Sequence, residues 1–251
     1  MLVLHLRASR RKARAAATAE ALALLEDLEP SAPAGGPLSE LGGTTWVTVP
    51  RHHLRLALVR LVRLGYSDAV DLVEPYAGAA DTAGLAPAVR WRRQWWQVVR
   101  VHQAEAATLR ERAPDRRPFL LACGDGQVRE VRGYRGTGAD GARRALPVPD
   151  ARMLVNLAGP PRGTLLDPFA GAGGIALEAC EAGWTVVTAD LDPVLRFGLA
   201  AVGALHLVGD ARRLPLRAGS VDAVVTEPPY DRAAGALLPQ VLPGLARALR
   251  P

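Results

Sequence analysis

The chain has 251 residues, of which 49% are apolar and 22% are charged, and its formal net charge is +6. This composition is typical of a folded protein and excludes a chain that is disordered throughout. No apolar run reaches the roughly 20 residues needed to cross a bilayer, and the first six residues are too short for a signal-peptide core, so we expect a cytoplasmic protein without membrane partners.

Residues 1–75 alternate between strand and helix patterns. The sequence predicts strands at 2–7, 44–49 and 69–73 and helices at 13–28 and 52–64, with a loop rich in Pro, Gly and Ser at 30–43. This order indicates a small N-terminal α+β domain, which we interpret as a ferredoxin-like module over residues 1–75.

Residues 76–148 are predicted to be an arginine-rich linker and RNA-binding region. Between residues 90 and 144, thirteen arginines stand against six acidic residues, so this window alone carries +7. Clustered positive charge is typical of a nucleic-acid-binding surface. Trp91, Trp95 and Trp96 lie among these arginines and have the spacing of a helix face that packs in a core; the alternative is stacking on RNA bases.

The same region contains a hairpin signal and one of the two cysteines. Segments 119–122 and 127–131 flank a Cys-Gly-Asp-Gly turn and predict two paired strands. Cys123 and Cys180 lack the spacing of zinc ligands or of a disulfide scaffold, so we expect two reduced thiols and no metal site.

Residues 149–251 show a regular alternation of short apolar strands with helices. After a helix at 151–157 capped by Asp150, strands are predicted at 164–167, 185–190, 204–209 and 221–226, and helices at 175–182, 193–202 and 238–250. This pattern predicts a Rossmann-like α/β domain with a parallel, doubly wound sheet.

Acidic residues follow each of these four strands. Asp167, Asp190, Asp210 and Glu227 are separated by 23, 20 and 17 residues, about one strand–helix unit each. Because parallel α/β sheets bind ligands at the carboxyl ends of their strands, these carboxylates are expected to line one binding site.

A glycine loop follows the first of these strands. Gly171 and Gly173 allow backbone torsions and a close approach that a side chain would block, and the next helix directs free N–H groups toward the loop. No Gly-Lys-Ser/Thr follows, which excludes a Walker A phosphate loop. The loop also fits G-x-G-x-x-A with Asp190 at the ribose-binding distance, so on this segment NAD and S-adenosylmethionine (SAM) are evenly matched.

The sequence Glu227-Pro228-Pro229-Tyr230 favours SAM. The two prolines fix the backbone and donate no hydrogen bonds, so their carbonyls are free to accept. A carboxylate before them can accept from an amine, and a tyrosine after them can stack on a planar base. This arrangement suits an amino group on an aromatic ring, for which a hydride-transfer enzyme has no use.

Together these motifs resemble those of SAM-dependent amino methyltransferases. Asp167-Pro168-Phe169-Ala170-Gly171-Ala172-Gly173 resembles their D-P-F-x-G-x-G motif, and Glu227-Pro228-Pro229-Tyr230 resembles their (D/N)-P-P-(Y/F/W) motif. The preceding segment, residues 152–158, is similar to that of the THUMP-associated tRNA guanine-N2 methyltransferases. The resemblance implies that residues 169–173 hold the methionine part of SAM, Asp190 the ribose, and Asp210, beside Ala211, the adenine amine. Glu227, the Pro228 carbonyl and Tyr230 would position the target amine.

The resemblance has two departures and leaves alternatives open. The family has Asp or Asn where this chain has Glu227, whose carboxylate reaches ~1.5 Å further. Its sheets continue with three further strands, so the domain is expected to be a C-terminally truncated fragment, or else N-terminal or partner strands cover the sheet edge. The expected substrate is an exocyclic amine in RNA, N2 of a tRNA guanosine; the alternatives are a DNA adenine-N6 or cytosine-N4 methyltransferase and an inactive SAM- or RNA-binding relative.

Overall fold

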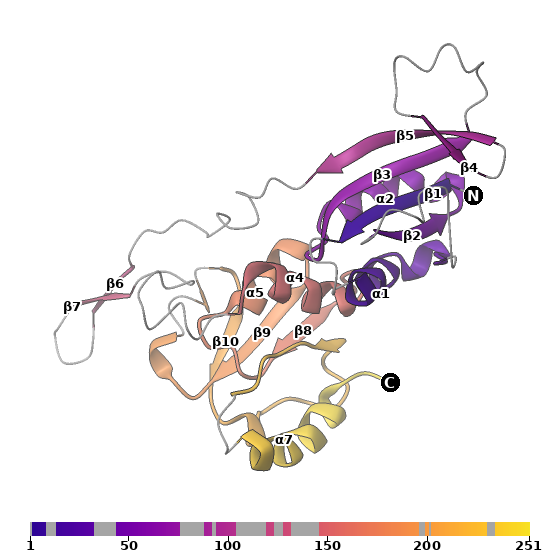
Figure 1. The fold of residues 1–251 in the computed structure, drawn as a ribbon. Helices are drawn as coiled ribbons and strands as arrows, with labels where there is room; N and C mark the ends of the chain where they lie inside the picture. Colours follow the sequence, from indigo (N-terminus) through magenta and orange to yellow (C-terminus); the bar gives the residue numbers. More distant parts are fainter. Residues whose placement is uncertain are drawn as a thin grey trace. The chain divides into compact units, whose positions relative to one another are not determined.

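The computed structural model describes residues 2–8, 14–32, 44–75, 88–91, 94–103, 119–122, 128–131, 146–195, 199–200, 202–229 and 234–251. The chain divides into two units, Met1–Glu111 and Arg112–Pro251, which are considered separately (Figure 1). No helix in the described ranges is long and apolar enough to cross a bilayer.

The first unit is built on one antiparallel sheet with the strand order β2-β1-β3-β5-β4. Its strands are β1 (Leu2–Ala8), β2 (Thr44–Val49), β3 (Ser67–Pro75), β4 (Ala88–Trp91) and β5 (Gln94–Gln103), and its helices are α1 (Arg14–Leu24) and α2 (Leu54–Leu61), with short 3-10 turns at Glu26–Leu28 and Arg51–His53. The predicted order of strand, helix, strand, helix, strand is confirmed.

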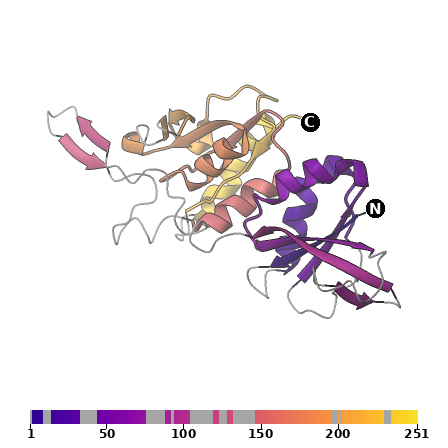
Figure 2. The same cartoon turned by 90° about the horizontal axis from the view of Figure 1, so that it is seen from above.

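Both helices pack on this sheet through one apolar cluster (Figure 2). Leu24 at the end of α1, Leu28 in the following 3-10 turn and Leu61 of α2 belong to one cluster with Val47 and Val49 of β2. In the same unit the buried Glu20 of α1 accepts hydrogen bonds from the backbone N–H groups of residues 65 (2.6 Å) and 66 (3.0 Å), so a helix side chain fixes the turn that leads into β3.

Three expectations about this unit differ from the structure. A helix separates β2 from β3, so the order is not the β-α-β-β-α-β of a ferredoxin-like module. The expected boundary at residue 75 falls inside the sheet, because β5 pairs with β3. The helix-face interpretation of Trp91, Trp95 and Trp96 is wrong: they lie in β4 and β5, where an aromatic and β-branched run favours a strand.

The second unit contains a hairpin and a parallel sheet. The hairpin of β6 (Phe119–Ala122) and β7 (Val128–Val131) is antiparallel, as predicted. The sheet has the order β10-β9-β8-β11, formed by β8 (Thr164–Asp167), β9 (Thr185–Asp190), β10 (Leu205–Val208) and β11 (Ala223–Val224). A Rossmann-like α/β sheet is therefore present, with the strand bounds of β8 and β9 as predicted.

Helices cover this sheet on both faces (Figures 1 and 2). Leu165 packs with α4 (Val148–Leu157) and α5 (Gly174–Ala182), whereas its neighbour Leu166 packs with α7 (Ala234–Ala248). Successive strand residues point to opposite faces, so the two clusters lie on opposite sides of the sheet, as the doubly wound prediction requires.

Several element boundaries differ from those predicted. Pro147 occupies the N-cap position of α4 and Asp150 lies in the first turn, because Pro149 is accommodated at the start of a helix. α7 begins four residues earlier than expected and contains two prolines; Val241 and Leu245 on its buried face pack against the sheet. Of the helix predicted at 193–202, residues 193–195 form a 3-10 turn, 199–200 are helical and 202 lies in a turn; residues 196–198 and 201 lie outside the described residues.

β11 is shorter than the predicted strand. It comprises two residues, both paired with β8, and Asp222 N before them donates to Thr164 O of β8 at 2.8 Å. Val221, where the strand was predicted to begin, pairs instead with the end of the chain: Val221 N donates to Ala248 O and Arg250 N donates to Val221 O. Beyond β11, Val225 N donates to Leu166 O at 3.0 Å, so Val225 still lies beside the edge of β8.

Candidate functional site

A cleft of about 1060 Å³ lies at the carboxyl ends of the parallel strands. Twelve of the thirteen site residues predicted from the sequence line it: Asp167, Pro168, Phe169, Ala170, Gly171, Gly173, Asp190, Asp210, Ala211, Glu227, Pro228 and Pro229. The thirteenth, Tyr230, lies outside the described residues. The rest of the lining is Leu146, Pro147, Ala172, Gly174, Ile175, Leu191, Gly209, Arg212, Ala236, Leu237 and Gln240.

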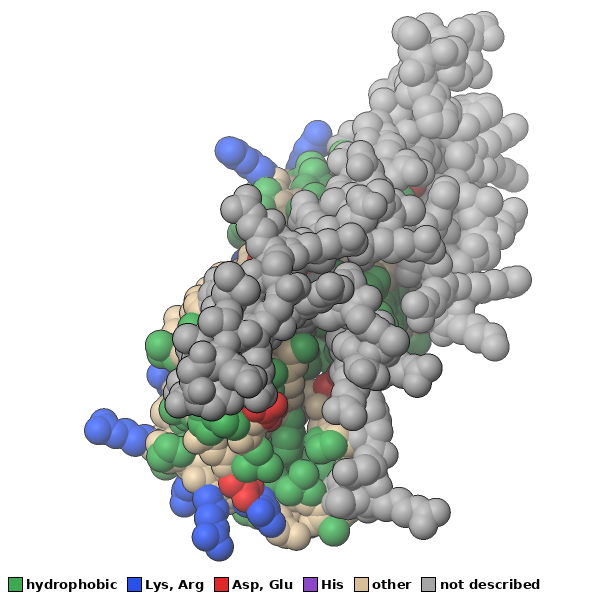
Figure 3. All heavy atoms as spheres, turned by 90° about the vertical axis from the view of Figure 1, so that its left-hand side faces the viewer, with side chains coloured by type: hydrophobic (Ala, Val, Ile, Leu, Met, Phe, Trp, Pro, Cys, Tyr) green, Lys and Arg blue, Asp and Glu red, His purple; other side chains and the backbone are tan. Residues whose placement is uncertain are grey.

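The cleft is mixed in character, with acidic side chains among apolar ones. Figure 3 shows this mixture on one face of the molecule, with acidic side chains in red, apolar ones in green and arginines, in blue, projecting around them. A lining that is apolar in part, with a few polar groups, is typical of a small-molecule site.

The glycine loop, residues 168–173, needs its two glycines for their backbone conformation. Gly171 has φ of 49° and Gly173 has φ of 78°, in the left-handed region that L side chains rarely adopt. Gly173 is also the N-cap of α5, so the loop turns directly into the helix and aims its first N–H groups toward the cleft.

Asp190 at the end of β9 fastens this loop to the sheet. Its Oδ2 accepts from Gly171 N at 2.8 Å and its Oδ1 accepts from Asp192 N at 3.0 Å, while Ala170 N donates to Ala189 O at 3.0 Å. Each carboxylate oxygen has two acceptor directions, so Asp190 can accept further hydrogen bonds from a ligand while it holds the loop.

Asp167 is buried at the end of β8, with 1% of its surface exposed. Its Oδ1 accepts from Thr226 Oγ1 at 2.6 Å and from Phe169 N at 3.2 Å. The pKa of Asp167 is raised to about 7, mainly by burial; the charges of Asp190 and Glu227 also raise it, and the two hydrogen bonds oppose the rise. This carboxyl group therefore changes its charge near neutral pH.

Asp210 follows β10 and is held by Arg212. Its carboxylate caps the short turn Ala211–Arg213 by accepting from Arg212 N at 2.9 Å, and it forms an ion pair with the Arg212 guanidinium. The hydrogen bonds from the Arg212 side chain lower the pKa of Asp210 to about 2.

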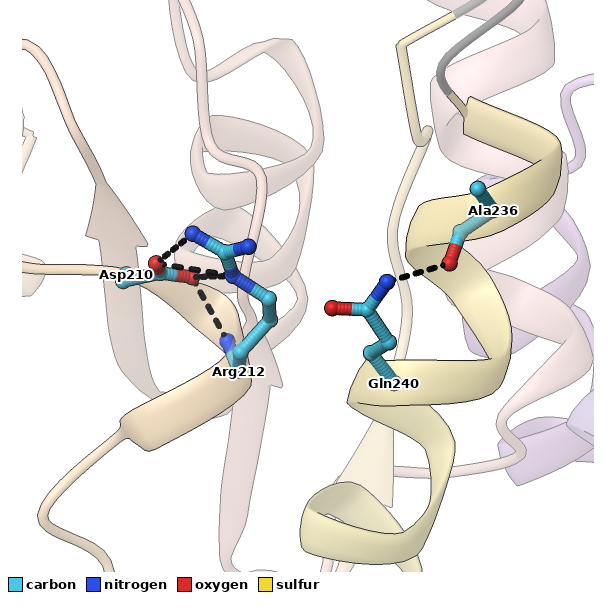
Figure 4. A network of polar contacts seen from close by, with 4 residues as sticks. All are labelled: Asp210, Arg212, Ala236 and Gln240. Atoms are coloured by element: carbon cyan, nitrogen blue, oxygen red, sulfur yellow. Dashed lines mark hydrogen bonds and ion pairs between the residues drawn. The ribbon is translucent and has the colours of Figure 1, made fainter.

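Gln240 of α7 lies across from this pair (Figure 4). Its Nε2 donates to Ala236 O at 2.9 Å in the preceding turn, and both Gln240 and Arg212 line the cleft. An amine that binds Asp210 must share the carboxylate with Arg212 or displace it.

The Glu-Pro-Pro segment, residues 227–229, forms the part of the cleft that follows β11. Glu227 and Pro228 are half-buried and Pro229 is exposed. Since neither proline has an N–H group, the segment offers carbonyl and carboxylate acceptors to a ligand.

Sequence reasoning missed Thr226, Arg212 and Gln240. Thr226 and Arg212 stand next to predicted motif residues, and their hydroxyl and guanidinium groups were the available signals. Gln240 has no local signal, because the packing of α7 brings it to the cleft.

Comparison with known proteins finds similarity in sequence over part of the chain. No protein family profile matches the chain. Over 94 residues it is 40% identical to a tRNA (guanine(10)-N2)-dimethyltransferase of Methanothermobacter thermautotrophicus, a match that covers 34% of this chain and 27% of that protein. The chain thus spans about a quarter of the length of this relative.

A solved structure described as a putative methyltransferase from an antibiotic biosynthesis pathway of Anabaena variabilis is also similar. It is 22% identical over 36% of each chain, with a TM-score of 0.31. A likeness at this level carries no weight for the function.

Proposed function

We propose that the chain is a SAM-dependent methyltransferase that acts on an exocyclic amine of a nucleobase in RNA, N2 of a tRNA guanosine. The observation that supports this most is that the glycine loop and the Glu-Pro-Pro segment line the same cleft. The partial match to a tRNA guanine-N2 dimethyltransferase agrees with it.

The cleft fits SAM in size and chemistry. Ligand pockets commonly measure ~300–1,000 Å³, so about 1060 Å³ leaves room for a nucleoside cofactor together with part of a target base. The glycine loop would hold the methionine part, Asp190 the ribose hydroxyls, and Asp210 the adenine amine. When bound, SAM supplies a methyl group on a positively charged sulfur.

The Glu-Pro-Pro segment would act on the target amine. A nucleobase amine is a weak nucleophile because its lone pair is delocalised into the ring. Hydrogen bonds from its N–H groups to the Glu227 carboxylate and the Pro228 carbonyl would localise that lone pair toward the methyl group. The Glu227 carboxylate would accept the proton that the amine gives up when its nitrogen takes the methyl group and the methyl–sulfur bond breaks.

Tyr230 and the arginine-rich region would bind the substrate. Tyr230 follows the Glu-Pro-Pro segment directly in the sequence and would stack on the target base. The +7 charge between residues 90 and 144 would attract the RNA backbone.

The test is methyl transfer from labelled SAM by the whole chain, offered tRNA and duplex DNA in parallel. We expect SAM to bind and tRNA to accept the methyl group. Transfer to duplex DNA alone would support a DNA adenine-N6 or cytosine-N4 methyltransferase, and SAM binding without any acceptor would support an inactive relative. Failure to bind SAM would overturn the cofactor assignment.

Glu227→Ala tests the amine-binding role. Because Glu227 is proposed to contact the amine and not the cofactor, transfer should be lost while SAM affinity stays within a few-fold, measured by calorimetry. Glu181→Ala is the matched control, since Glu181 is exposed on α5 and does not line the cleft. An undiminished rate in the Glu227→Ala variant would remove Glu227 from the mechanism.

A further inference from the structure

One buried carboxylate oxygen joins the two functional segments of the cleft. Asp167 Oδ1 accepts from Phe169 N at 3.2 Å and from Thr226 Oγ1 at 2.6 Å. Phe169 belongs to the glycine loop, and Thr226 directly precedes the Glu-Pro-Pro segment. Two hydrogen bonds to this oxygen therefore connect the Thr226 hydroxyl with the glycine loop. The side chain between them, that of Asp167, is 1% exposed.

The Glu-Pro-Pro segment depends on such an anchor. β11 pairs with β8 over only two residues, and Val225 N adds one more hydrogen bond, to Leu166 O. Pro228 and Pro229 have no N–H with which to continue this pairing. At the point where backbone pairing ends, the Thr226 hydroxyl ties the strand end to the end of β8.

We propose that Thr226 is a positioning residue, whose hydroxyl holds Asp167 and the Glu-Pro-Pro segment in one fixed arrangement with the glycine loop. The inference rests on the proposed function, since it is methyl transfer that requires the cofactor and the amine to be held at one separation. A small displacement between reacting groups is enough to slow a reaction strongly.

The same hydrogen bond also affects the charge of Asp167. A hydroxyl that donates to a carboxylate favours the ionised form and lowers its pKa, against the burial that raises it and the charges of Asp190 and Glu227, which act in the same sense as burial. Removal of the hydroxyl should therefore move the titration of Asp167 to higher pH. A role of Thr226 that does not involve this hydrogen bond would not move that titration.

The experiment compares Thr226→Val, which keeps the shape and loses the hydroxyl, with Thr226→Ser, which keeps the hydroxyl. Asp167 is titrated in the whole chain by ¹³C NMR of its carboxyl carbon, assigned with Asp167→Asn. We expect the midpoint to rise by roughly one pH unit in Thr226→Val and to stay close to the wild-type value in Thr226→Ser. Thr226→Ala is a second hydroxyl-free variant with the same expectation, should the valine variant fail to fold.

Transfer kinetics give the second readout. In Thr226→Val we expect kcat to fall about tenfold or more, with SAM affinity within a few-fold at a pH where Asp167 is ionised, and Thr226→Ser should recover the rate. An Asp167 midpoint that is unchanged in the hydroxyl-free variants, while the wild-type chain binds SAM, would overturn the positioning role alone. Absence of SAM binding by the wild-type chain would overturn the proposed function, and the positioning role with it.

Discussion

Asp167 combines deep burial with a charge that changes near neutral pH. Its pKa is about 7 in the folded chain, against an ordinary value of 3.8. Between these two values the folded chain binds a proton that the unfolded chain has released. The carboxyl group therefore favours the folded state at low pH, and this contribution is lost as the pH rises toward 7.

Replacement of this group should remove that pH dependence. We expect the difference in unfolding free energy between the wild type and Asp167→Asn to fall by about 1.4 kcal/mol per pH unit from about pH 4 to pH 7 and to level off above. Urea unfolding of both proteins at pH 5, 6, 7 and 8 measures it. Parallel stability curves across this range would show that Asp167 titrates in the fold as it does in the unfolded chain.

At the scale of single residues, the acids of the cleft were predictable and their partners were not. Asp167, Asp190 and Asp210 follow apolar strands, and parallel strands bring their carboxyl ends to one edge. The engagement of Asp210 by Arg212 depends on a side-chain conformation, and the contact of Thr226 with Asp167 depends on which strands are neighbours. Neither contact can be predicted from the spacing of residues along the chain.

Among the elements, α4 and α5 are joined by a buried ion pair. Arg152 Nε donates to Glu178 Oε2 at 2.8 Å, and the two side chains are 6% and 1% exposed. Because α5 begins at the glycine loop, this pair fixes the helix that forms one wall of the cleft.

Breaking this pair on one side should destabilise the second unit strongly. Glu178→Gln leaves the Arg152 charge buried without its counter-ion, which typically costs about 3–5 kcal/mol. The apolar double replacement Arg152→Met with Glu178→Leu should cost less. The control is Asp27→Asn at the more exposed Arg60–Asp27 pair, expected to cost under about 1 kcal/mol. Urea unfolding ranks the three variants by their loss of unfolding free energy. Equal losses in all three would contradict a stabilising role for the buried Arg152–Glu178 pair.

The bounds of helices and strands were predicted well where the local residue pattern sets them. They were predicted poorly where pairing with another strand sets them. β2, β8 and β9 have the predicted bounds because their apolar and β-branched runs are bounded by turn residues. β11 was predicted too long, since Val221, its expected first residue, pairs with the chain end. β4 and β5 were missed, because an arginine-rich segment suggested a surface rather than a sheet, and pairing with β3 supplies the hydrogen-bond partners.

On the scale of the whole molecule, the cleft belongs to one unit. Every described residue that lines it falls within Arg112–Pro251. We therefore expect residues 112–251, expressed alone, to bind SAM within about tenfold of the whole chain, a factor worth about 1.4 kcal/mol. The same fragment lacks residues 90–111 of the arginine-rich region and should therefore bind tRNA more weakly than the whole chain. Calorimetry with SAM and filter binding with tRNA separate these effects, and loss of SAM binding by a folded fragment would show that the first unit completes the cleft.

The acidic strand ends also bear on turnover. Asp190, Asp210 and Glu227 place carboxylates around one cleft, and Asp167 adds a further negative charge as the pH rises above about 7. SAM carries a net positive charge, and S-adenosylhomocysteine, which lacks the methyl group, carries none, so under the proposed function these carboxylates would attract SAM more strongly than the product. Added salt should therefore lower the affinity for SAM more than the affinity for S-adenosylhomocysteine. Competition binding at 50 and 300 mM NaCl would measure both affinities. Carboxylates that assemble the cleft would thereby help to empty it after each methyl transfer.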